Sequence, residues 1–418
     1  MTQLKDDCFA HGDELTPLDV ALEQLEQTVN AVVGIEEVPL IDALARILAE
    51  DVVAERNVPP HDNSAVDGYA VCHQDLSPDA DSRLPVAGRI TAGHKLGRPA
   101  KPGEVYRIFT GAPMPERCDT VFMQEDVRLE GDDVILPAGI KQGSNRRFKG
   151  EDVTTGSVIL ARGKRLRPQE VGLAASVGRS KLFVYKALRV AVFSTGDEVR
   201  DPSQDAPEGC IFDANRFTIM GLLVRLGCQV TDLGILEDDE TVIKDALASA
   251  ARDHDLLFTS GGVSVGDEDH IKPAVEKLGS LHFWRLAIKP GRPIAFGQVA
   301  GTPFVGLPGN PVAAMVTFMC VARGLVLRLS GAHDVNPTVY RVRAAFTFKG
   351  KGGRREWLRA RLEIDGDGLY SAHLFPAAGS GVLTSMVASD GLVEVSEDQT
   401  QINEGDLVDY LAFPELCP

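Results

Sequence analysis

DLLFTSGGVSVGDED, residues 255–269, joins a short apolar stretch to a glycine-rich loop and three acids. The apolar part is typical of a buried strand, and the small side chains of the loop let backbone N–H groups approach a phosphate or a pterin-sized ligand. In an open α/β sheet, ligands bind beyond the carboxyl ends of the strands, near the N-terminus of the following helix. This stretch therefore predicts an α/β domain and the position of a binding site within it.

The alternation of strand, loop and helix continues on both sides of this stretch, through residues 188–330. Strands are expected at residues 188–193, 229–234, 255–259, 281–287, 294–298 and 304–306, and helices at 215–226, 240–252, 269–278 and 310–329. Such alternation is typical of a doubly wound α/β domain with a mainly parallel sheet.

The pattern changes outside this domain. Thr16 is the expected N-cap of a first helix, with Pro17 at its first position and an apolar face that serves packing. From residue 52 to 149, and again after residue 331, short apolar stretches alternate with turns, which predicts β structure. We therefore predict a discontinuous helical linker domain (1–51 and 153–186), an inserted β-rich domain (52–152), the α/β domain (187–330) and a C-terminal β-barrel or sandwich (331–418).

The charge balance restricts the class of protein. The 418 residues carry a formal net charge of −17, which argues against nucleic-acid binding and against an anionic membrane surface, so an anionic ligand must meet a local group of cations. The N-terminus has no apolar signal segment, and the longest apolar run, residues 311–321, is shorter than a membrane span, so we expect a cytoplasmic protein. Seven scattered cysteines without a C-x-x-C pair predict neither a disulfide framework nor a thiolate metal site.

Acidic residues follow several predicted strands of the α/β domain. They are Asp197, Glu198, Asp238, Asp239 and the three acids at 267–269. Carboxylates that converge at one edge of a sheet could hold Mg²⁺, which prefers oxygen ligands. For any one of these acids alone, a solvated loop position or a helix cap is the simpler interpretation.

Other segments carry cations or stiff turns. KPGRP (289–293) follows Arg285 by four residues, and GLPGNP (306–311) is a stiff turn before an apolar helix. In the inserted domain, DNSAVDGYA (62–70) is a dense polar turn and RRFKGED (146–152) is a short basic cluster. The basic segments could bind anionic oxygens, and a solvated surface is the alternative for them, as a purely structural turn is for GLPGNP.

These segments together resemble the molybdopterin molybdenumtransferases, the enzymes of the last step of molybdenum-cofactor synthesis. The motifs that carry the resemblance are DNSAVDGYA (62–70), TGAPMP (110–115), KGED (149–152), STGDE (194–198), SGGVSVGDED (260–269), KPGRP (289–293), GLPGNP (306–311), GRREW (353–357) and GSGVLTSM (379–386). The resemblance implies the four domains above, with a molybdopterin-binding α/β domain and a C-terminal β-barrel, in a head-to-tail homodimer whose active site lies between subunits. It also implies Mg²⁺-dependent insertion of molybdate into adenylated molybdopterin with release of AMP, and a molybdopterin adenylyltransferase as a partner.

The resemblance implies roles for individual residues of the α/β domain and the barrel. Glu198 and Asp269 resemble the acids of the pterin and Mg²⁺ site, with Asp238 as a third metal ligand. The substrate-binding loop comprises Ser260, Gly261, Gly262, Ser264 and Gly266. The oxyanion pocket comprises Lys289, Arg292, Arg354 and Ser380, beside Arg285, with Pro308 and Pro311 shaping its wall. Ala313 departs from the family, which usually has a serine there, and Arg285 stands where a lysine is common.

The resemblance also assigns residues of the inserted domain. Asp67, Thr110 and Asp152 resemble functional residues that reach the neighbouring subunit's cleft, and Arg147 and Lys149 are placed to steer an anionic substrate.

Two alternatives of other classes stay open. A gephyrin-like scaffold would use its dimer to cluster partners, although the chain contains no long disordered linker. A nucleotide amidohydrolase of the competence-damage family would account for the TGDE and SGGVSVG motifs but would leave those of the N-terminal and C-terminal regions unexplained. Release of AMP from adenylated molybdopterin distinguishes the enzyme from both.

Overall fold

A six-stranded sheet forms the centre of the α/β domain in the computed structural model, which describes residues 15–262, 270–291 and 293–417. Its strands are β13 (Arg189–Thr195), β16 (Gln229–Leu236), β17 (Leu256–Ser260), β18 (Gly279–Arg285), β20 (Pro293–Val299) and β21 (Thr302–Leu307). The spatial order is β16-β13-β17-β21-β20-β18, with the first four strands parallel and the β20 and β18 strands antiparallel to their neighbours. The prediction of a mainly parallel sheet is confirmed.

Helices cover both faces of this sheet, because its strands place apolar side chains on both faces. Along β13, Val190 and Val192 pack into one apolar cluster, whereas Ala191 and Phe193 pack into another on the opposite face. The helices are α3 (Asn215–Arg225), α4 (Glu240–Asp253), α5 (Ile271–Leu278), α6 (Pro311–Thr317) and α7 (Arg323–Leu329). A π-helical turn, Phe318–Ala322, joins α6 to α7 into one continuous helical stretch.

The stretch Pro311–Leu329 is also the one segment of the described chain with the length and composition of a membrane-crossing helix. Its most apolar window is 78% buried inside the protein. A buried core helix has the same composition, so this feature is explained by packing between the sheet, α3 and the C-terminal domain.

The first helix, α1 (Leu18–Thr28), begins one residue later than expected and has Pro17 at its N-cap position. Thr16 is not the cap because its backbone is extended and pairs with Leu286, and the Ala287 N–H donates to the Thr16 carbonyl at 2.9 Å. The apolar face of α1 packs into the core of the α/β domain, beside α7. Although α1 precedes the linker in sequence, it belongs to the core of the α/β domain.

Two antiparallel pairings bring together the chain segments before and after the inserted domain. They join β1 (Ile35–Pro39) to β12 (Lys181–Tyr185) and β2 (Val52–Val53) to β11 (Val158–Leu160), beside α2 (Pro168–Ser176) and a short 3₁₀ turn, Leu40–Asp42. A small apolar core fills the space between them. The linker therefore contains paired strands as well as a helix.

The inserted domain is a separate β structure. Its sheet has the order β7-β4-β6-β5-β9-β8, formed by β4 (Gly68–Val71), β5 (Ser82–Ile90), β6 (Val105–Ile108), β7 (Thr120–Met123), β8 (Arg128–Glu130) and β9 (Asp133–Leu136). A second pairing joins β3 (Asn63–Ser64) to β10 (Arg146–Arg147), and 3₁₀ turns lie at His73–Asp75 and Gln124–Asp126. The β structure predicted between residues 52 and 149 is therefore observed.

The C-terminal domain is a closed β-barrel. Its strands are β22 (Tyr340–Ala344), β24 (Arg355–Ile364), β25 (Tyr370–Leu374), β26 (Gly391–Val395) and β28 (Leu407–Ala412). The order β24-β25-β22-β28-β26 closes because β26 also pairs with β24. Short elements complete the domain: β23 (Phe348–Lys349), β27 (Gln401–Ile402), α8 (Thr384–Val387) and α9 (Phe413–Leu416). The barrel prediction is confirmed, and closure removes the sheet edges.

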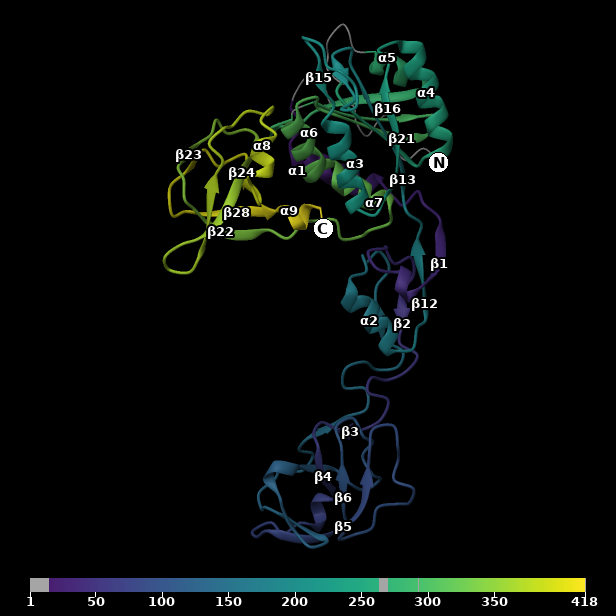
Figure 1. The fold of residues 1–418 in the computed structure, drawn as a ribbon, viewed down its shortest axis with the longest axis vertical. Coiled ribbons are helices and arrows are strands. Elements are labelled where there is room, and N and C mark those ends of the chain that lie inside the picture. Colours follow the sequence, from purple (N-terminus) through teal and green to yellow (C-terminus); the bar gives the residue numbers. More distant parts are fainter. Residues whose placement is uncertain (1–14, 263–269, 292, 418) are drawn as a thin grey trace.

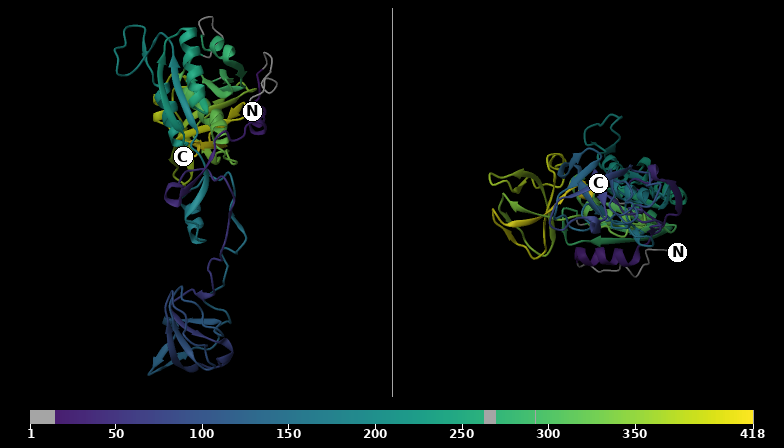
Figure 2. Two further views of the ribbon diagram at one scale, coloured as in Figure 1. Left: turned by 90° about the vertical axis from the view of Figure 1, so that its right-hand side faces the viewer. Right: turned by 90° about the horizontal axis from the view of Figure 1, so that it is seen from below.

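The domains are arranged as an elongated molecule (Figures 1 and 2). The barrel lies against the α/β domain, because β19 (Ile288–Lys289) leaves the α/β domain and pairs in parallel with β24. The linker extends away from this end, and the inserted domain lies at the opposite end of the molecule. The motifs of the inserted domain are therefore distant from the α/β domain of their own chain.

Candidate functional site

Two adjoining cavities lie at the carboxyl ends of the parallel strands. The first, which we call the sheet-edge cavity, has about 320 Å³ and lies among the ends of β13, β16 and β17, the N-terminus of α3 and the turn before α6. The second, the barrel-side cavity, has about 580 Å³ and lies between the same loops and strand β24 of the barrel. Both are lined by Glu198, Gly261, Gly262 and Gly309. The two cavities therefore form one site with two compartments, where an α/β sheet is expected to bind ligands.

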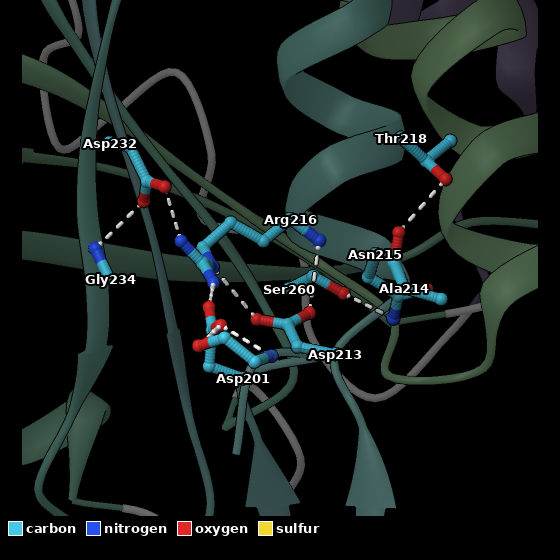
Figure 3. Close-up of polar contacts among 10 residues, drawn as sticks. Asp201, Asp213, Ala214, Asn215, Arg216, Thr218, Asp232, Gly234 and Ser260 are labelled. Carbon is cyan, nitrogen blue, oxygen red and sulfur yellow. Dashed lines mark hydrogen bonds and ion pairs between the residues drawn. The ribbon is translucent and has the colours of Figure 1, made fainter.

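The N-terminus of α3 is fixed beside the sheet-edge cavity by a buried arginine (Figure 3). The Arg216 side chain is 3% exposed and donates to Asp213 at 3.0 Å, to Asp201 at 2.6 Å and to Asp232. Burial by itself lowers the pKa of Arg216, but its hydrogen bonds to these three carboxylates outweigh burial and raise it. Arg216 therefore joins α3, β16 and the loop after β14 (Val199–Arg200) into one unit.

The residue before this arginine connects two of the predicted loops. Asn215 Nδ2 donates to Ser260 Oγ and to the Gly309 carbonyl, each at 2.7 Å, and Ser260 Oγ donates to the Pro308 carbonyl at 3.1 Å. Figure 3 shows Asn215 between α3 and Ser260. The start of the glycine-rich loop is thereby held against the GLPGNP turn.

Glycine is required in this loop by close packing. Gly262 has a φ of +63°, and a Cβ atom there would lie 2.5 Å from Ile271 Cδ1 and 2.7 Å from Thr195 Oγ1. A side chain would therefore strain the backbone and collide with its neighbours, and the loop would move away from the cavity. The neighbouring Gly261 also has a positive φ, +84°.

Two of the predicted acids line the sheet-edge cavity. Glu198 is exposed and its carbonyl accepts a hydrogen bond from the Ile211 N–H at 2.8 Å, and Asp238 lines the same cavity. The described residues contain no group of three or more candidate metal ligands, and Asp269 lies outside them. Two carboxylates at one cavity suit Mg²⁺, because this ion is usually bound by one or two carboxylates, phosphate oxygens and water. Asp239 instead caps α4, accepting from Thr241 N and Val242 N, as the simpler interpretation predicted.

Cations gather around one buried acid in the barrel-side cavity. Lys289 Nζ and Arg354 Nε each lie 2.9 Å from a different carboxylate oxygen of Glu356. Burial by itself raises the pKa of Glu356, but the hydrogen bonds and charges of the two cations outweigh it and lower the pKa. Lys289 and Glu356 line the cavity, whereas Arg354 holds Glu356 and is not among the described residues that line it.

Arg359 is a second cation of this cavity, and its hydrogen-bond partners differ from those of Lys289. Its side chain is buried, lines the cavity, and donates to Ser385 Oγ at 3.1 Å and to the carbonyls of Ala377 at 2.7 Å and Gly379 at 3.3 Å. Burial lowers the pKa of Arg359. None of these partners is an acid, so Arg359 brings into the cavity a positive charge that no hydrogen-bonded carboxylate in the described structure neutralises.

The remaining predicted site residues of the α/β domain and the barrel are divided between the two cavities or lie outside the described residues. Pro308 and Ser380 line the barrel-side cavity and Pro311 lines the sheet-edge cavity. The Val312 N–H donates to the Ser380 carbonyl at 3.0 Å, which joins α6 to the barrel domain. Ala313 lines the barrel-side cavity without a hydroxyl group. Ser264, Gly266 and Arg292 lie outside the described residues, and so does the side chain of Arg285.

In the inserted domain, the structure brings Asp67 and Thr110 together. Asp67 Oδ1 accepts from the Thr110 backbone N–H and from Thr110 Oγ1, each at 2.8 Å, and these two hydrogen bonds lower the pKa of Asp67. Asp152, Arg147 and Lys149 are exposed on the same domain. This group lies at the opposite end of the molecule from the two cavities (Figure 1), so a single chain does not bring it to them.

Sequence reasoning missed four residues that shape the site: Asn215, Arg216, Glu356 and Arg359. Arg359 carried a usable signal, because it follows Trp357 by two residues in the same strand and therefore lies on the same face as that buried side chain. Glu356 lay inside the GRREW motif, directly after two arginines. Asn215 and Arg216 gave no comparable signal, because their partners are 15 to 94 residues away in sequence, apart from Asp213.

Three models of known protein families match most of the chain. Residues 16–178 match the MoeA N-terminal region (domain I and II), residues 191–328 match a probable molybdopterin binding domain, and residues 341–413 match the MoeA C-terminal region (domain IV). These matches and the two-compartment cleft define a multidomain protein built around a molybdopterin-binding fold.

Individual relatives give the family. A molybdopterin molybdenumtransferase of Haemophilus influenzae is 37% identical over 401 residues, which are 96% of this chain and 99% of the relative, and one of Nostoc is 33% identical over 91% of this chain and 89% of the relative. The structure of the molybdopterin biosynthesis moeA protein of Pyrococcus horikoshii superimposes with a TM-score of 0.82 and 30% identity over 96% of this chain and 100% of that one. The chain belongs to the molybdopterin molybdenumtransferases, enzymes of molybdenum-cofactor biosynthesis.

The resemblance stated from the motifs is therefore confirmed, and so are the fold class and the assignment as an enzyme. The matches extend over the N-terminal region and the barrel as well as the α/β domain. They favour this family over a nucleotide amidohydrolase, which accounts for the α/β motifs alone.

Proposed function

We propose that this chain inserts molybdate into adenylated molybdopterin and releases AMP in a Mg²⁺-dependent step. The observation that carries the proposal is the pair of joined cavities, one with a helix N-terminus, the start of the glycine-rich loop and two acids, the other with cations. Adenylated molybdopterin and molybdate are both anions, and they must meet for the transfer. A site whose two compartments meet at Glu198 and Gly309 offers a place for each substrate beside the other.

The sheet-edge cavity suits the pterin substrate and its phosphates. The start of the glycine-rich loop and the N-terminus of α3 both line this cavity, and loops and helix ends of this kind stabilise phosphate oxygens. Glu198 and Asp238 would hold Mg²⁺, with Asp269 as a third ligand, and the bound ion would neutralise charge on the phosphoanhydride as AMP leaves. Asn215 and Arg216 keep the loop and the helix terminus in place, so that the site is formed before substrate binds.

The barrel-side cavity suits molybdate. Lys289 and Arg359 are the cations that line it, and Glu356 fixes the ammonium of Lys289 while Arg359 is fixed by carbonyl groups. Rigid donors bind an oxyanion better than mobile ones, because less side-chain entropy is lost on binding. Ser380 lines the barrel side of this cavity. Arg285 and Arg292, which the resemblance assigns to the oxyanion pocket, are proposed to add charge for the same substrate.

The proposal includes a homodimer in the cytoplasm. Asp67, Thr110 and Asp152, with Arg147 and Lys149, would reach the cleft of the neighbouring subunit, because the linker holds them far from the cleft of their own chain. A molybdopterin adenylyltransferase would deliver the adenylated substrate.

Molybdate-dependent release of AMP tests the proposal directly. The purified protein is incubated with adenylated molybdopterin and Mg²⁺, with and without molybdate, and AMP is quantified by chromatography. Glu198→Gln and Asp269→Asn should abolish AMP release while the oligomeric state is preserved, because each removes a charge from a loop and not a core contact. A protein that dimerises but never releases AMP would instead be a scaffold, and wild-type activity in both variants would refute the assignment of these acids.

A further inference from the structure

Two large apolar side chains are exposed at the sheet-edge cavity. They belong to β15 (Ile211–Phe212), where Ile211 is 59% exposed and Phe212 is 53% exposed, and both line the cavity. Burying an aromatic side chain is worth about 2 kcal/mol, so a half-exposed phenylalanine beside a ligand-sized cavity forgoes stabilisation in the free protein. A ligand that covers the ring would recover it.

The backbone of β15 is held firmly in spite of this exposure. β15 pairs in parallel with β14, with Ile211 opposite Val199 and Phe212 opposite Arg200. The Asp213 N–H donates to the Arg200 carbonyl at 2.9 Å, and the Asp213 side chain is bound to the buried Arg216. The position of Phe212 is therefore fixed on both sides, and little entropy is lost when a ligand contacts it.

The other walls of the cavity also carry polar groups. Glu198 and Asp238 supply carboxylates, and Gly261 and Gly262 line the cavity without side chains. An aromatic face beside hydrogen-bonding groups suits a flat heteroaromatic ring, which stacks on the phenyl ring and directs its polar edge to the acids and the backbone. The cavity volume of about 320 Å³ is sufficient for one such ring system and not for a folded peptide.

We propose that Phe212 is the stacking residue for a heteroaromatic ring of the substrate. The inference rests on the proposed function, since adenylated molybdopterin carries two such rings, a pterin and an adenine. Both rings have the same stacking chemistry, and the test separates them.

Binding of two small probes to the full-length protein tests the proposal. The probes are AMP, which carries the adenine, and 6-hydroxymethylpterin, which carries the pterin, and their affinities are measured by isothermal titration calorimetry. Phe212→Ala should weaken binding of the probe whose ring stacks on it by about 5- to 150-fold, the range that corresponds to loss of a base–aromatic stack. Phe212→Tyr should retain affinity, and Phe212→Leu, which is apolar but not aromatic, should lose it.

Phe217 provides the matched control. It is 46% exposed on α3, contacts the Arg216 guanidinium at 4.8 Å from its ring centroid, and is not among the described residues that line the cavity. Phe217→Ala should bind both probes as the wild-type protein does. An equal loss of affinity in Phe217→Ala, full affinity in Phe212→Ala or Phe212→Leu, or failure of the wild-type protein to bind either probe would each overturn the proposal.

Failure of the stacking role and failure of the proposed reaction would give different results. If the wild-type protein releases AMP with molybdate and Phe212→Ala binds both probes normally, the stacking role alone fails. If the wild-type protein releases no AMP but Phe212→Ala still weakens one probe, the reaction fails and the stacking role stands. Dissociation of an oligomer by Phe212→Ala, with both affinities unchanged, would show that a second copy of the chain covers the ring, and would also overturn the proposal.

Discussion

The sheet-edge cavity and the Asp67–Thr110 pair of the inserted domain are built in opposite ways. At the cavity, a buried arginine joins three acids from separate segments, and the loops it supports are connected to each other by Asn215. In the inserted domain, two hydrogen bonds to one partner hold Asp67, and the Thr110 side chain is exposed.

This difference indicates what each region requires. A site that must present backbone N–H groups to a charged substrate is kept rigid, because reorganisation on binding would weaken the interaction. A half-buried acid such as Asp67, bound through its side chain to Thr110, gains a more defined environment when another surface covers it.

The largest effect on stability is expected from Arg216→Met. Removal of the guanidinium leaves Asp213, which is 3% exposed, as a buried charge without its partner, and such losses cost about 3 to 5 kcal/mol. The free energy of unfolding is measured with urea. Arg189→Met is the control, because Arg189 forms an ion pair with Asp255 but is 49% exposed, and it should cost less than about 1 kcal/mol. Equal costs would show that the buried network has no special role.

A mixture of two inactive variants tests whether the two regions meet across a dimer. Asp67→Asn and Glu198→Gln homodimers should each release no AMP, but after subunits exchange, half of the dimers are heterodimers with one intact composite site. About a quarter of wild-type activity should therefore return, because a two-fold dimer has two such sites. A mixture that stays inactive after exchange, verified by mass spectrometry, would place Asp67 outside the site.

Substitutions of Arg359, in β24, and of Arg354, which directly precedes β24, should differ in their effect on the molybdate concentration that the enzyme requires. Arg359→Met should raise the molybdate concentration needed for half-maximal AMP release by about 10-fold or more, because a charge-assisted contact with the oxyanion is lost. Arg354→Met should have a smaller effect, since Arg354 acts through Glu356. The reverse order would show that Arg354, as first inferred from the motif, is the direct ligand.

The smallest effect is a pH dependence of stability. Because the pKa of Glu356 is lowered below its ordinary value of 4.5 in the folded protein, its contribution is fully present above pH 4.5 and is lost as the pH falls through the folded-state pKa. The free energy of unfolding should therefore fall on acidification below pH 4.5, and Glu356→Gln should flatten that fall. Identical slopes for the variant and the wild-type protein would contradict the proposed role of the ion pairs.

Particular residues show how far sequence reasoning reached. The glycine-rich loop, the strands of the sheet and the acids at strand ends were predictable, because strand period and small-residue loops are local properties. Arg354 was inferred from the GRREW motif, whereas the structure places Arg359 at the cavity wall, because only the path of β24 decides which side chain points there. The packing of α1 on the α/β core was equally out of reach, since an apolar face does not specify its partner.

The amino-acid sequence was enough to predict the order of the four regions, the mainly parallel sheet and the family, because hydrophobic period and short motifs are properties of neighbouring residues. Only the tertiary structure decided that Arg216 holds acids from three segments, that Glu356 rather than solvent pairs with Lys289, and that Phe212 is exposed at the cavity. These contacts depend on distance in space, and distance in space between residues far apart in sequence is set by how the helices, strands and domains pack.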